Sequence, residues 1–432
     1  MRIAIIGAGY AGMAAAMELA SHGRQVEVFE AGPLPGGRAR RVEIDGLALD
    51  NGQHMAIGAY RELLRLMALA SVEVDAAFAR LPMELDVYSG SQRRMRLACP
   101  RLPAPWHTLV GLLCAEGLDA RARWAAIRTM AVARLQGWRL KQDQSVAGWL
   151  AAQGQPDILV RCLWEPLTLA ALNTPIASAS AQVLLNVLRD SLAAERAASD
   201  FLLPRSDLSA LFPEAAARYL QARGGQLHCQ ALVKQVTRTD TGWQLDRGTG
   251  DYAQLILALP PHRLGMLAES LPALSQPLAM LANWQWQPIY TVYLQYPAGT
   301  RLAKPMLGMV DSCAQWLFDR GQLCGQDGLL AAVISAEGRH EAYTQAELAA
   351  VVAEEVARCQ PQLPAPLWQR VIAEKRATYA CTPDLARPGN ATREPSLWLA
   401  GDYTAGPYPA TLEGAVRSGV AAAQGVLART QP

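Results

Sequence analysis

A glycine-rich turn between two short apolar runs limits the possible folds of this chain more than any other feature. Residues 2–6 form an apolar β-type run, residues 10–22 place Ala, Met and Leu at helical spacing, and residues 25–30 form a second β-type run. The turn before the helix follows the GxGxxG pattern, with Gly7, Gly9 and Gly12. The segment therefore predicts a βαβ unit of a Rossmann-like α/β domain that binds a dinucleotide.

Each residue of this motif has a mechanical task. Gly7 permits the tight turn, Gly9 lets the backbone approach a pyrophosphate, and Gly12 allows the helix to pack closely on the strand. The helix N-terminus offers free N–H groups to the phosphate charge. Glu30, at the end of the second strand, can accept hydrogen bonds from the adenosine ribose. We therefore predict that these four residues bind the cofactor.

A second glycine turn follows and favours FAD over NAD. Gly36, Gly37 and Arg38 come soon after Glu30. At this place backbone groups and a fixed cation can approach a long cofactor. We therefore expect Gly37 and Arg38 to contact FAD.

Composition and charge exclude several classes of protein. The 40 Lys and Arg residues nearly balance the 38 Asp and Glu residues, so the formal net charge of +2 gives no field for nucleic acid. The 8 cysteines include no CxxC pair, and we expect neither a metal site nor a disulfide framework. Hydrophobic residues make up 51% of the chain and charged residues 18%, which suits a large interior or an apolar ligand site.

Two long uncharged stretches resemble membrane spans in composition. Residues 166–188 contain Asn, Gln, Thr and Pro, and residues 270–300 are interrupted by four prolines. A spanning helix of about 20 residues does not tolerate such breaks. We expect no transmembrane span and interpret both stretches as interior walls. The N-terminal run enters a glycine motif instead of a cleavage site, so we expect a cytoplasmic protein.

The remaining pattern predicts two domains built from alternating parts of the chain. The FAD-binding domain is expected to consist of residues 1–75, 201–262 and 371–432, which carry most of the α/β signals. Residues 76–200, mostly helical, and residues 263–370 are expected to form a mixed α+β substrate domain. The predicted fold class is therefore α/β, with a discontinuous nucleotide-binding domain.

These motifs resemble those of the flavin amine oxidase and carotenoid desaturase superfamily. The opening pattern of that superfamily, GxGxxGxxxAxxLxxxGxxVxVxE followed by GGR, is met throughout residues 7–38. A central β-segment is similar to the one whose valine backbone meets adenine, with Val233 in the matching place. A strand ending in Gly401 and Asp402, followed by a helix near Thr411 and Leu412, is similar to the C-terminal flavin-binding end. The resemblance implies that these five residues also contact FAD.

Three strings are more specific and resemble hydroxysqualene dehydroxylases, the squalene-associated FAD enzymes of bacterial hopanoid pathways. They are DNGQHMAIGAYRE at 50–62, WEPL with ALNTP within 164–175, and YPATLEGA at 408–415. The resemblance implies reductive dehydroxylation, in which hydroxysqualene and reduced FAD give squalene, FAD and water. Acid-assisted loss of water and hydride transfer from flavin N5 would accomplish it.

Four residues of these strings are candidates for the substrate site. His54 is the first candidate for the acid, although it could equally hydrogen-bond backbone or FAD. Tyr408 could present its ring to the isoalloxazine and to positive charge. Trp164 and Asn173 could line the substrate site, but a packing role for Trp164 and a turn role for Asn173 are the simpler interpretations. The sequence does not select the proton donor.

Three other functions compete with this hypothesis. A carotenoid desaturase handles similar polyisoprenes in the opposite redox direction. A flavin amine oxidase usually carries a lysine on a substrate-domain strand, but residues 288–296 contain none. A prenyl-binding escort protein on the same fold would lack flavin and catalysis.

The partners implied are a C30 isoprenoid substrate and an external electron donor, because only one dinucleotide motif is present. Residues 121–141 contain six basic residues and no acidic one. As one helix, they would place an apolar stripe between cationic edges. This pattern predicts peripheral contact with an anionic membrane, and a core helix with solvated arginines is the alternative.

Overall fold

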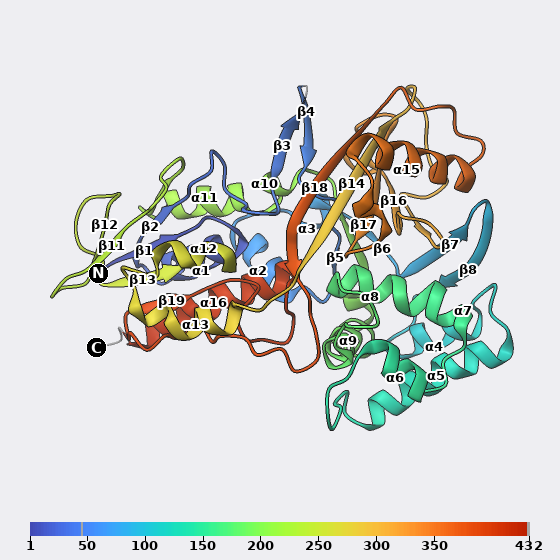
Figure 1. Cartoon of the computed structure of the whole chain (residues 1–432), viewed down its shortest axis with the longest axis horizontal. Coiled ribbons are helices and arrows are strands. Elements are labelled where there is room, and N and C mark those ends of the chain that lie inside the picture. Colours follow the sequence, from blue (N-terminus) through green and yellow to red (C-terminus); the bar gives the residue numbers. More distant parts are fainter. Residues whose placement is uncertain (45, 430–432) are drawn as a thin grey trace.

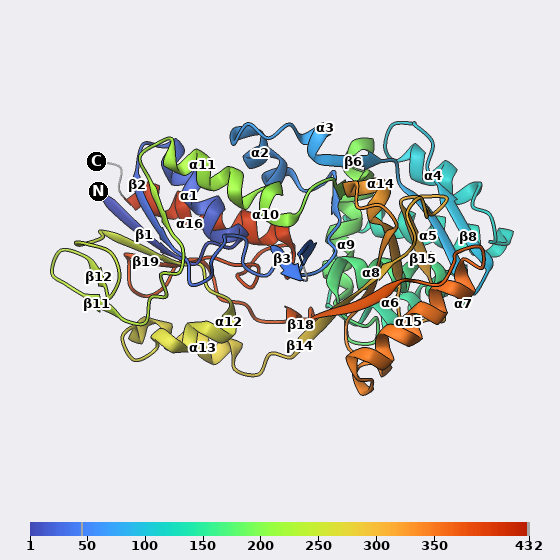
Figure 2. The same ribbon diagram turned by 90° about the horizontal axis from the view of Figure 1, so that it is seen from above.

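The computed structural model describes residues 1–44 and 46–429, which form two halves that lie side by side (Figure 1). One half holds both ends of the described chain and a parallel sheet. The other holds a larger mixed sheet and a group of helices. The long strands β14, Trp286–Gln295, and β18, Trp368–Tyr379, run from the boundary between the halves into the second one (Figures 1 and 2).

The parallel sheet has five strands in the order β10-β2-β1-β13-β19. Their bounds are Gln226–His228, Gln25–Phe29, Arg2–Ile6, Gln254–Leu257 and Leu397–Leu399. The five strands thus come from three distant parts of the chain, and each pairs in parallel with its neighbours. This arrangement confirms the predicted α/β class and the N-terminal βαβ unit.

Both faces of this sheet are covered, because successive side chains of β1 point to opposite faces and all those from Ile3 to Ile6 are buried. Ile3 and Ile5 face a core shared with α1, Tyr10–Ser21, and α16, Leu412–Arg429. Ala4 and Ile6 face the opposite core, which includes leucines of the segment around α12, Pro261–Leu264, and α13, Ser275–Leu281. The helix α11, Pro213–Gln221, also packs against α1.

The second half is built on a seven-stranded sheet in the order β18-β14-β17-β16-β15-β7-β8. The strands not yet given are Leu329–Ser335, Trp316–Asp319, Met306–Met309, Glu84–Ser89 and Gln92–Ala98. The helix α15, Gln345–Cys359, packs on β18 and β14. Within this sheet β15 and β7 pair in parallel, and the other pairs are antiparallel.

The helical part of this half extends from α4 to α9 (Figure 1). Its main helices are α4 Trp106–Leu113, α5 Ala120–Leu135, α6 Val146–Ala152, α8 Glu165–Leu172 and α9 Ala181–Leu188. Two π-helical turns adjoin these helices: the turn at Val160–Trp164 continues into α8, and the turn at Arg189–Ala193 follows α9. The predicted helical stretch at 76–200 therefore also contains the strands β7 and β8.

The prediction of one helix over 121–141 is wrong. The helix α5 ends at Leu135, because Gly137 takes a left-handed φ of +64° that an α-helix cannot continue through. The following Trp138 turns inward and keeps 7% of its surface exposed. Its carbonyl accepts a hydrogen bond from the side chain of Gln182 at 2.9 Å.

Two of the predicted domain limits divide structural units. The strand β18 pairs with β14 from Trp368 to Tyr379, so the large sheet continues past the limit at residue 370. The leucines of residues 264–281 pack on the parallel sheet, on the other side of the limit at residue 262. Elsewhere the predicted division remains a prediction.

The described part of the chain contains no helix long and apolar enough to cross a bilayer.

Candidate functional site

A cavity of about 790 Å³ lies where the two halves meet. Its lining comes from both glycine turns, the loop at 51–55, the end of α8, the segments at 231–233 and 258–263, the large sheet, and the start of α16. Of the predicted cofactor-binding residues, ten line it: Gly7, Gly9, Glu30, Gly37, Arg38, Val233, Gly401, Asp402, Thr411 and Leu412. The fold thus brings together residues from the beginning, the middle and the end of the chain.

The two glycine turns approach each other closely. Gly36 donates its N–H to Ala8 O at 2.8 Å. A Cβ on Gly37, whose φ is +62°, would lie 3.1 Å from Gly9 Cα. Gly9 also begins α1 without a side-chain cap, so the first N–H groups of this helix stay available for an anion. A pyrophosphate fits this cradle.

Gly12 differs from the other motif glycines because it does not line the cavity. A Cβ at this position would lie 1.9 Å from Gly7 O and 3.1 Å from Ala258 Cβ. Its place agrees with the predicted packing task rather than with direct contact to a ligand.

Glu30 and Val233 form the end of the cavity expected to hold adenosine. The Glu30 carboxylate accepts hydrogen bonds from Ala8 N at 2.8 Å and from Gly32 N at 2.7 Å. The backbone of Ala231 donates to Glu30 O at 2.8 Å and so holds the segment with Val233 beside the turn. A carboxylate fixed at the end of β2 is the group that the ribose hydroxyls of a dinucleotide require.

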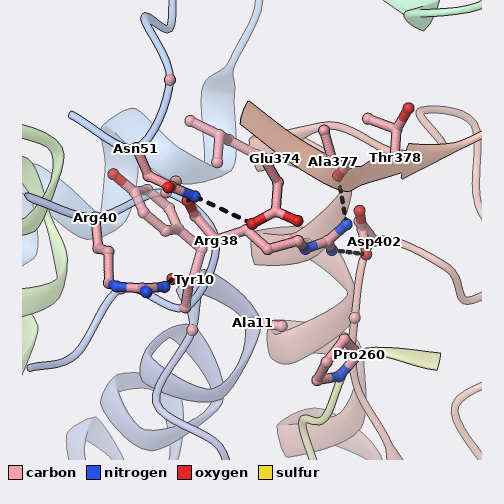
Figure 3. A pocket seen from close by; sticks show the side chains of 18 of the residues that line it. Tyr10, Ala11, Arg38, Arg40, Asn51, Pro260, Glu374, Ala377, Thr378 and Asp402 are labelled. Atoms are coloured by element: carbon pink, nitrogen blue, oxygen red, sulfur yellow. Dashed lines mark hydrogen bonds and ion pairs between the residues drawn. The ribbon is translucent and has the colours of Figure 1, made fainter. Parts of the chain in front are cut away.

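At the other end, Arg38 connects three segments (Figure 3). Its guanidinium donates to Asp402 Oδ1 at 2.6 Å and to Ala377 O at 2.6 Å. Asn51 donates to Arg38 O at 3.1 Å and to Glu374 Oε2 at 3.2 Å. The second glycine turn, the loop before His54, the strand β18 and the C-terminal Gly-Asp turn are therefore held together at one point.

A β-bulge in β18 creates part of this contact. Gln287 of β14 pairs with Thr378, whereas Ile289 pairs with Glu374, so residues 375–377 of β18 lie opposite the single residue Pro288 and β18 has two extra residues here. The bulge turns the carbonyl of Ala377 toward Arg38 and places Glu374 in the lining of the cavity. Bulges commonly redirect side chains beside functional sites in this way.

The start of α16 forms the wall opposite this bulge. Thr411 accepts a hydrogen bond from Gly414 N at 2.9 Å and thereby caps the helix. Leu412, Thr411 and Ala415 line the cavity, so the positive end of the helix dipole lies beside it. This wall can stabilise negative charge on a ligand.

His54 lines the same cavity with only one of its nitrogens engaged. Its Nδ1 lies 2.7 Å from Gly52 O, which fixes the proton on Nδ1, and within the described residues Nε2 forms no hydrogen bond. Burial lowers the pKa of His54, an effect that the bond to Gly52 O and nearby Asp50 only partly offset. The ring is therefore mostly neutral near pH 7, with Nε2 free to accept a hydrogen bond from a ligand.

A buried ion pair supports the loop that carries His54. Arg320 donates to Asp50 Oδ2 at 3.1 Å and to Gln53 Oε1 at 2.7 Å, and both charged side chains are at most 3% exposed. Tyr293 donates its hydroxyl to Asp50 O at 3.0 Å. Burial raises the pKa of Asp50, although Arg320 acts in the opposite direction.

Between α8 and the large sheet the lining becomes mainly apolar. The apolar side chains of this arm, called the apolar arm below, are Met55, Leu169, Ala170, Ala171, Leu172, Ile289, Trp316, Phe318 and Val333. Its polar members are His54, Asn173, Ser335 and Thr378.

Asn173 lines this arm, but its amide is fully used by the protein. Its Nδ2 donates to Thr378 Oγ1 at 2.9 Å and to Pro288 O at 3.3 Å, and its Oδ1 accepts from Ala336 N at 2.7 Å. Its φ of +45° ends α8, which Asn tolerates better than most residues. Asn173 thus joins α8 to the bulged strands and shapes the wall without a free polar group.

Two predicted substrate-site residues lie outside the cavity lining. Trp164 is 2% exposed and donates its indole N–H to Gln155 Oε1 at 2.7 Å, which supports the packing interpretation. The ring of Tyr408 lies 4.8 Å from the guanidinium of Arg417, and the structure gives it no contact with the cavity.

Several lining residues are absent from the sequence-based predictions. Trp316 and Phe318 occupy alternate positions of β16, and this spacing could have identified them as one face of a strand. Glu374 carries no such signal, because only the bulge turns it inward.

Comparisons with known proteins agree with this geometry. The sequence model of the family described as flavin containing amine oxidoreductase matches residues 10–427. The chain is 30% identical to hydroxysqualene dehydroxylase of Sinorhizobium fredii, over 99% of this chain and 98% of that protein. It is 30% identical to the enzyme of the same name in Rhodopseudomonas palustris, over 98% of each.

More distant relatives include zeta-carotene desaturase of Synechocystis, which is 25% identical over 99% of this chain and 97% of that protein. Among solved structures, an oxidoreductase from Methanosarcina mazei matches with a TM-score of 0.76 at 17% identity, over 98% of this chain and 100% of that one. That likeness concerns the fold alone.

Proposed function

The chain belongs to the flavin-containing amine oxidoreductase family, in its group of hydroxysqualene dehydroxylases, and we propose that it converts hydroxysqualene to squalene. It is an FAD-dependent oxidoreductase. One observation carries the proposal: a single cavity joins the turns that suit FAD to an apolar arm containing His54. A C30 alcohol needs such an arm for its chains and one polar group for its oxygen.

FAD would be held along the length of the cavity. The adenosine would lie at Glu30 and Val233, the pyrophosphate at the two glycine turns, and the ribityl and flavin parts near Arg38, Asp402 and the start of α16. The remaining predicted contacts are Gly401, Thr411 and Leu412. The close glycine approach and the uncapped start of α1 support this placement.

Reduced FAD, when bound, supplies a hydride. The chain itself must then provide a proton, so that the hydroxyl group leaves as water, and must keep other water away from the electron-poor allylic carbon. The apolar arm supports the second task.

We assign the proton to His54. Since the Gly52 carbonyl fixes Nδ1–H, Nε2 is the nitrogen that would bind the substrate hydroxyl and deliver a proton to it. The lowered pKa of His54 makes its protonated form a stronger acid than an ordinary imidazolium, although this form is the minor one at neutral pH. Tyr408 and Trp164 receive no role in the chemistry here, because neither lines the cavity.

Amine oxidation is disfavoured by the same cavity. The lysines of the chain are Lys141, Lys234, Lys304 and Lys375, and none of them is among the residues that line it. Lys304 instead forms ion pairs with Glu84 and Asp86. A carotenoid desaturase would use a similar apolar arm, and its relatedness keeps it as the second candidate.

The deciding experiment is a single turnover without oxygen. Photoreduced holoenzyme is mixed with hydroxysqualene, and flavin absorbance and squalene are followed together. We expect reoxidation of the flavin with one squalene formed per flavin. No squalene, together with desaturation of phytoene by the oxidised enzyme, would establish the second candidate instead.

The proposal includes two partners. Because the chain carries one dinucleotide motif, an external donor would reduce the flavin. Because the substrate dissolves in lipid, we further propose that the protein works at a membrane surface.

A further inference from the structure

The outward side of α5 combines apolar and basic residues. Trp124 is 65% exposed and Leu135 is 87% exposed. At 100° per residue, Trp124, Ala131 and Leu135 fall within an arc of about 40°. Arg121 and Arg128 lie at one edge of this arc. We call these five residues, together with Arg134 at the other edge, the α5 face.

The positive charge of this region is not neutralised by the protein. None of the six basic residues between 121 and 141 forms an ion pair with any residue that the structure describes. The nearby acids are engaged elsewhere. Glu116 pairs with Arg93 and Arg96, and Asp119 caps α5 by accepting a hydrogen bond from Ala122 N at 2.7 Å.

The neighbouring helix adds further exposed apolar groups. Trp106, at the start of α4, is 59% exposed, and Leu113, at its end, is 40% exposed. The two helices pack together, and Arg123 of α5 donates to Leu113 O at 3.0 Å. The exposed indoles of Trp106 and Trp124 add aromatic groups of the kind that is enriched at membrane interfaces.

A hollow of about 270 Å³ opens at the C-terminal end of the α5 face. It is lined by Arg134, Trp138, Arg189, Asp190, Ala193 and Ala194. Asp190 engages Nε and one terminal nitrogen of Arg189 at 2.7 and 2.8 Å, which leaves the other terminal nitrogen available. The hollow therefore contains two guanidinium groups and one carboxylate, a net charge of +1, and both Arg134 and the remaining nitrogen of Arg189 can donate to a phosphate beside the buried indole.

We propose that the α5 face docks on a membrane containing anionic phospholipid, with one lipid phosphate seated between Arg134 and Arg189. Trp124 and Leu135 then enter the interface between headgroups and acyl chains, while Arg121 and Arg128 contact neighbouring headgroups. The uncompensated charge selects anionic lipid over a neutral surface.

Docking in this orientation places the helical part of the second half against the lipid. The hollow lies at the turn that follows α9, α9 packs against α8, and the end of α8 lines the apolar arm. The inference rests on the proposed function only for the reason why the protein would dock, which is access to a substrate dissolved in the bilayer. The binding itself can be measured without turnover.

The test uses the full FAD-loaded protein and flotation with two kinds of vesicle. One kind is phosphatidylcholine alone, and the other contains equal parts of phosphatidylcholine and phosphatidylglycerol. We expect flotation only with the second kind and release at high salt. Arg134→Glu should weaken vesicle binding about tenfold or more, because it removes an attraction of about 1 kcal/mol and adds repulsion between the new carboxylate and the anionic surface. The double variant Trp124→Ser/Leu135→Ser should lose most of the binding.

Matched controls change exposed residues elsewhere. Leu367→Ser alters a side chain that is 68% exposed, and Arg393→Glu reverses an exposed charge in the other half. Both should float like the unchanged protein, and thermal unfolding should confirm that all variants fold. Wild-type protein that stays in the unbound fraction, or variants of the α5 face that float like the controls, would overturn the proposal.

Turnover assays separate this inference from the proposed function. With hydroxysqualene in detergent micelles, the variants of the α5 face should keep the activity of the unchanged protein. With substrate supplied in anionic vesicles, they should lose it. Absence of turnover by the unchanged protein in both media would refute the proposed function. The flotation result would then still decide whether the α5 face binds anionic membranes.

Discussion

Arg38 and Asp402 are separated by 364 positions in the sequence and form an ion pair of 2.6 Å. Asp402 is 8% exposed, and the guanidinium also reaches the carbonyl of Ala377. The pair closes the end of the cavity where the flavin would lie, so cofactor binding should depend on it.

We predict that Asp402→Asn weakens FAD binding. Removing one partner of a buried charge pair costs about 2 kcal/mol or more, which corresponds to roughly a thirtyfold rise in Kd. This Kd is measured by titrating the apoprotein with FAD and monitoring flavin fluorescence. Asp240→Asn, at an exposed carboxylate that does not line the cavity, serves as the control and should bind FAD normally. Equal affinities for both variants would contradict the prediction.

His54→Gln should remove the proton donor. We expect kcat to fall about 10²- to 10⁴-fold, the usual contribution of general acid catalysis. In the unchanged enzyme kcat/KM should decline as pH rises through a pKa below the usual histidine range, since burial favours the neutral ring. The variant should lose this inflection while FAD binding stays intact. His22→Gln, at an exposed histidine, should retain both the rate and the inflection.

Arg320→Met should destabilise the protein by about 3 to 5 kcal/mol, because it leaves Asp50 buried without its counter-charge. Burial already raises the pKa of Asp50, and loss of Arg320 raises it further. A carboxyl whose pKa is raised in the folded state stabilises the fold at low pH, where it is protonated, and this stabilisation is lost as the pH rises through the raised pKa. The deficit in stability caused by Arg320→Met should therefore shrink as the pH falls and grow as the pH rises through that pKa. Urea unfolding at several pH values measures the deficit. The double variant Asp50→Asn/Arg320→Met should recover much of it, and a deficit independent of pH would contradict this account.

Gly12→Ala should lower both stability and FAD content. The added Cβ would lie 1.9 Å from Gly7 O, so helix α1 must shift, at a cost of about 1 to 3 kcal/mol or more. Gly23→Ala is the matched control, because its φ is +69° but nothing lies within 4 Å of the new Cβ. That variant should lose only about 1 to 2 kcal/mol and keep its FAD. Similar flavin content in the two variants would refute the packing role.

Trp164→Phe distinguishes packing from contact with the substrate. Loss of the hydrogen bond to Gln155 should cost about 1 kcal/mol in the free energy of unfolding. The KM for hydroxysqualene should stay unchanged, because the side chain lies outside the cavity lining. A raised KM at unchanged stability would restore Trp164 to the substrate site.

The glycine turns show what the sequence could predict. Gly7, Gly9 and Gly37 belong to turns whose spacing from the neighbouring strands and helix is visible in the sequence, so the local pattern indicates their place, although the close contacts of Gly7 and Gly37 are with the distant Ala258 and Gly9. The family comparisons confirm FAD. The α/β class followed from the same local signals. The roles of the individual site residues remain predictions.

What the sequence could not supply depends on contacts between distant segments. Arg320 reaches Asp50 across 270 positions, and Glu374 enters the cavity only through the bulge opposite Gln287 and Ile289. The helix predicted over 121–141 was wrong for a local reason. Hydrophobic periodicity outweighed Gly137 in that interpretation, whereas its left-handed backbone ends the helix.

The distance along the chain between Arg38 and Asp402 also sets an order of events during synthesis. At about 5 to 20 residues per second, a ribosome needs roughly 20 to 70 s to travel the 364 positions between them. Throughout that interval the nascent polypeptide has its first glycine turns but lacks the C-terminal strand and helix that complete the cavity. Capture of the flavin is therefore expected to follow translation, so yellow colour in a preparation reports finished chains.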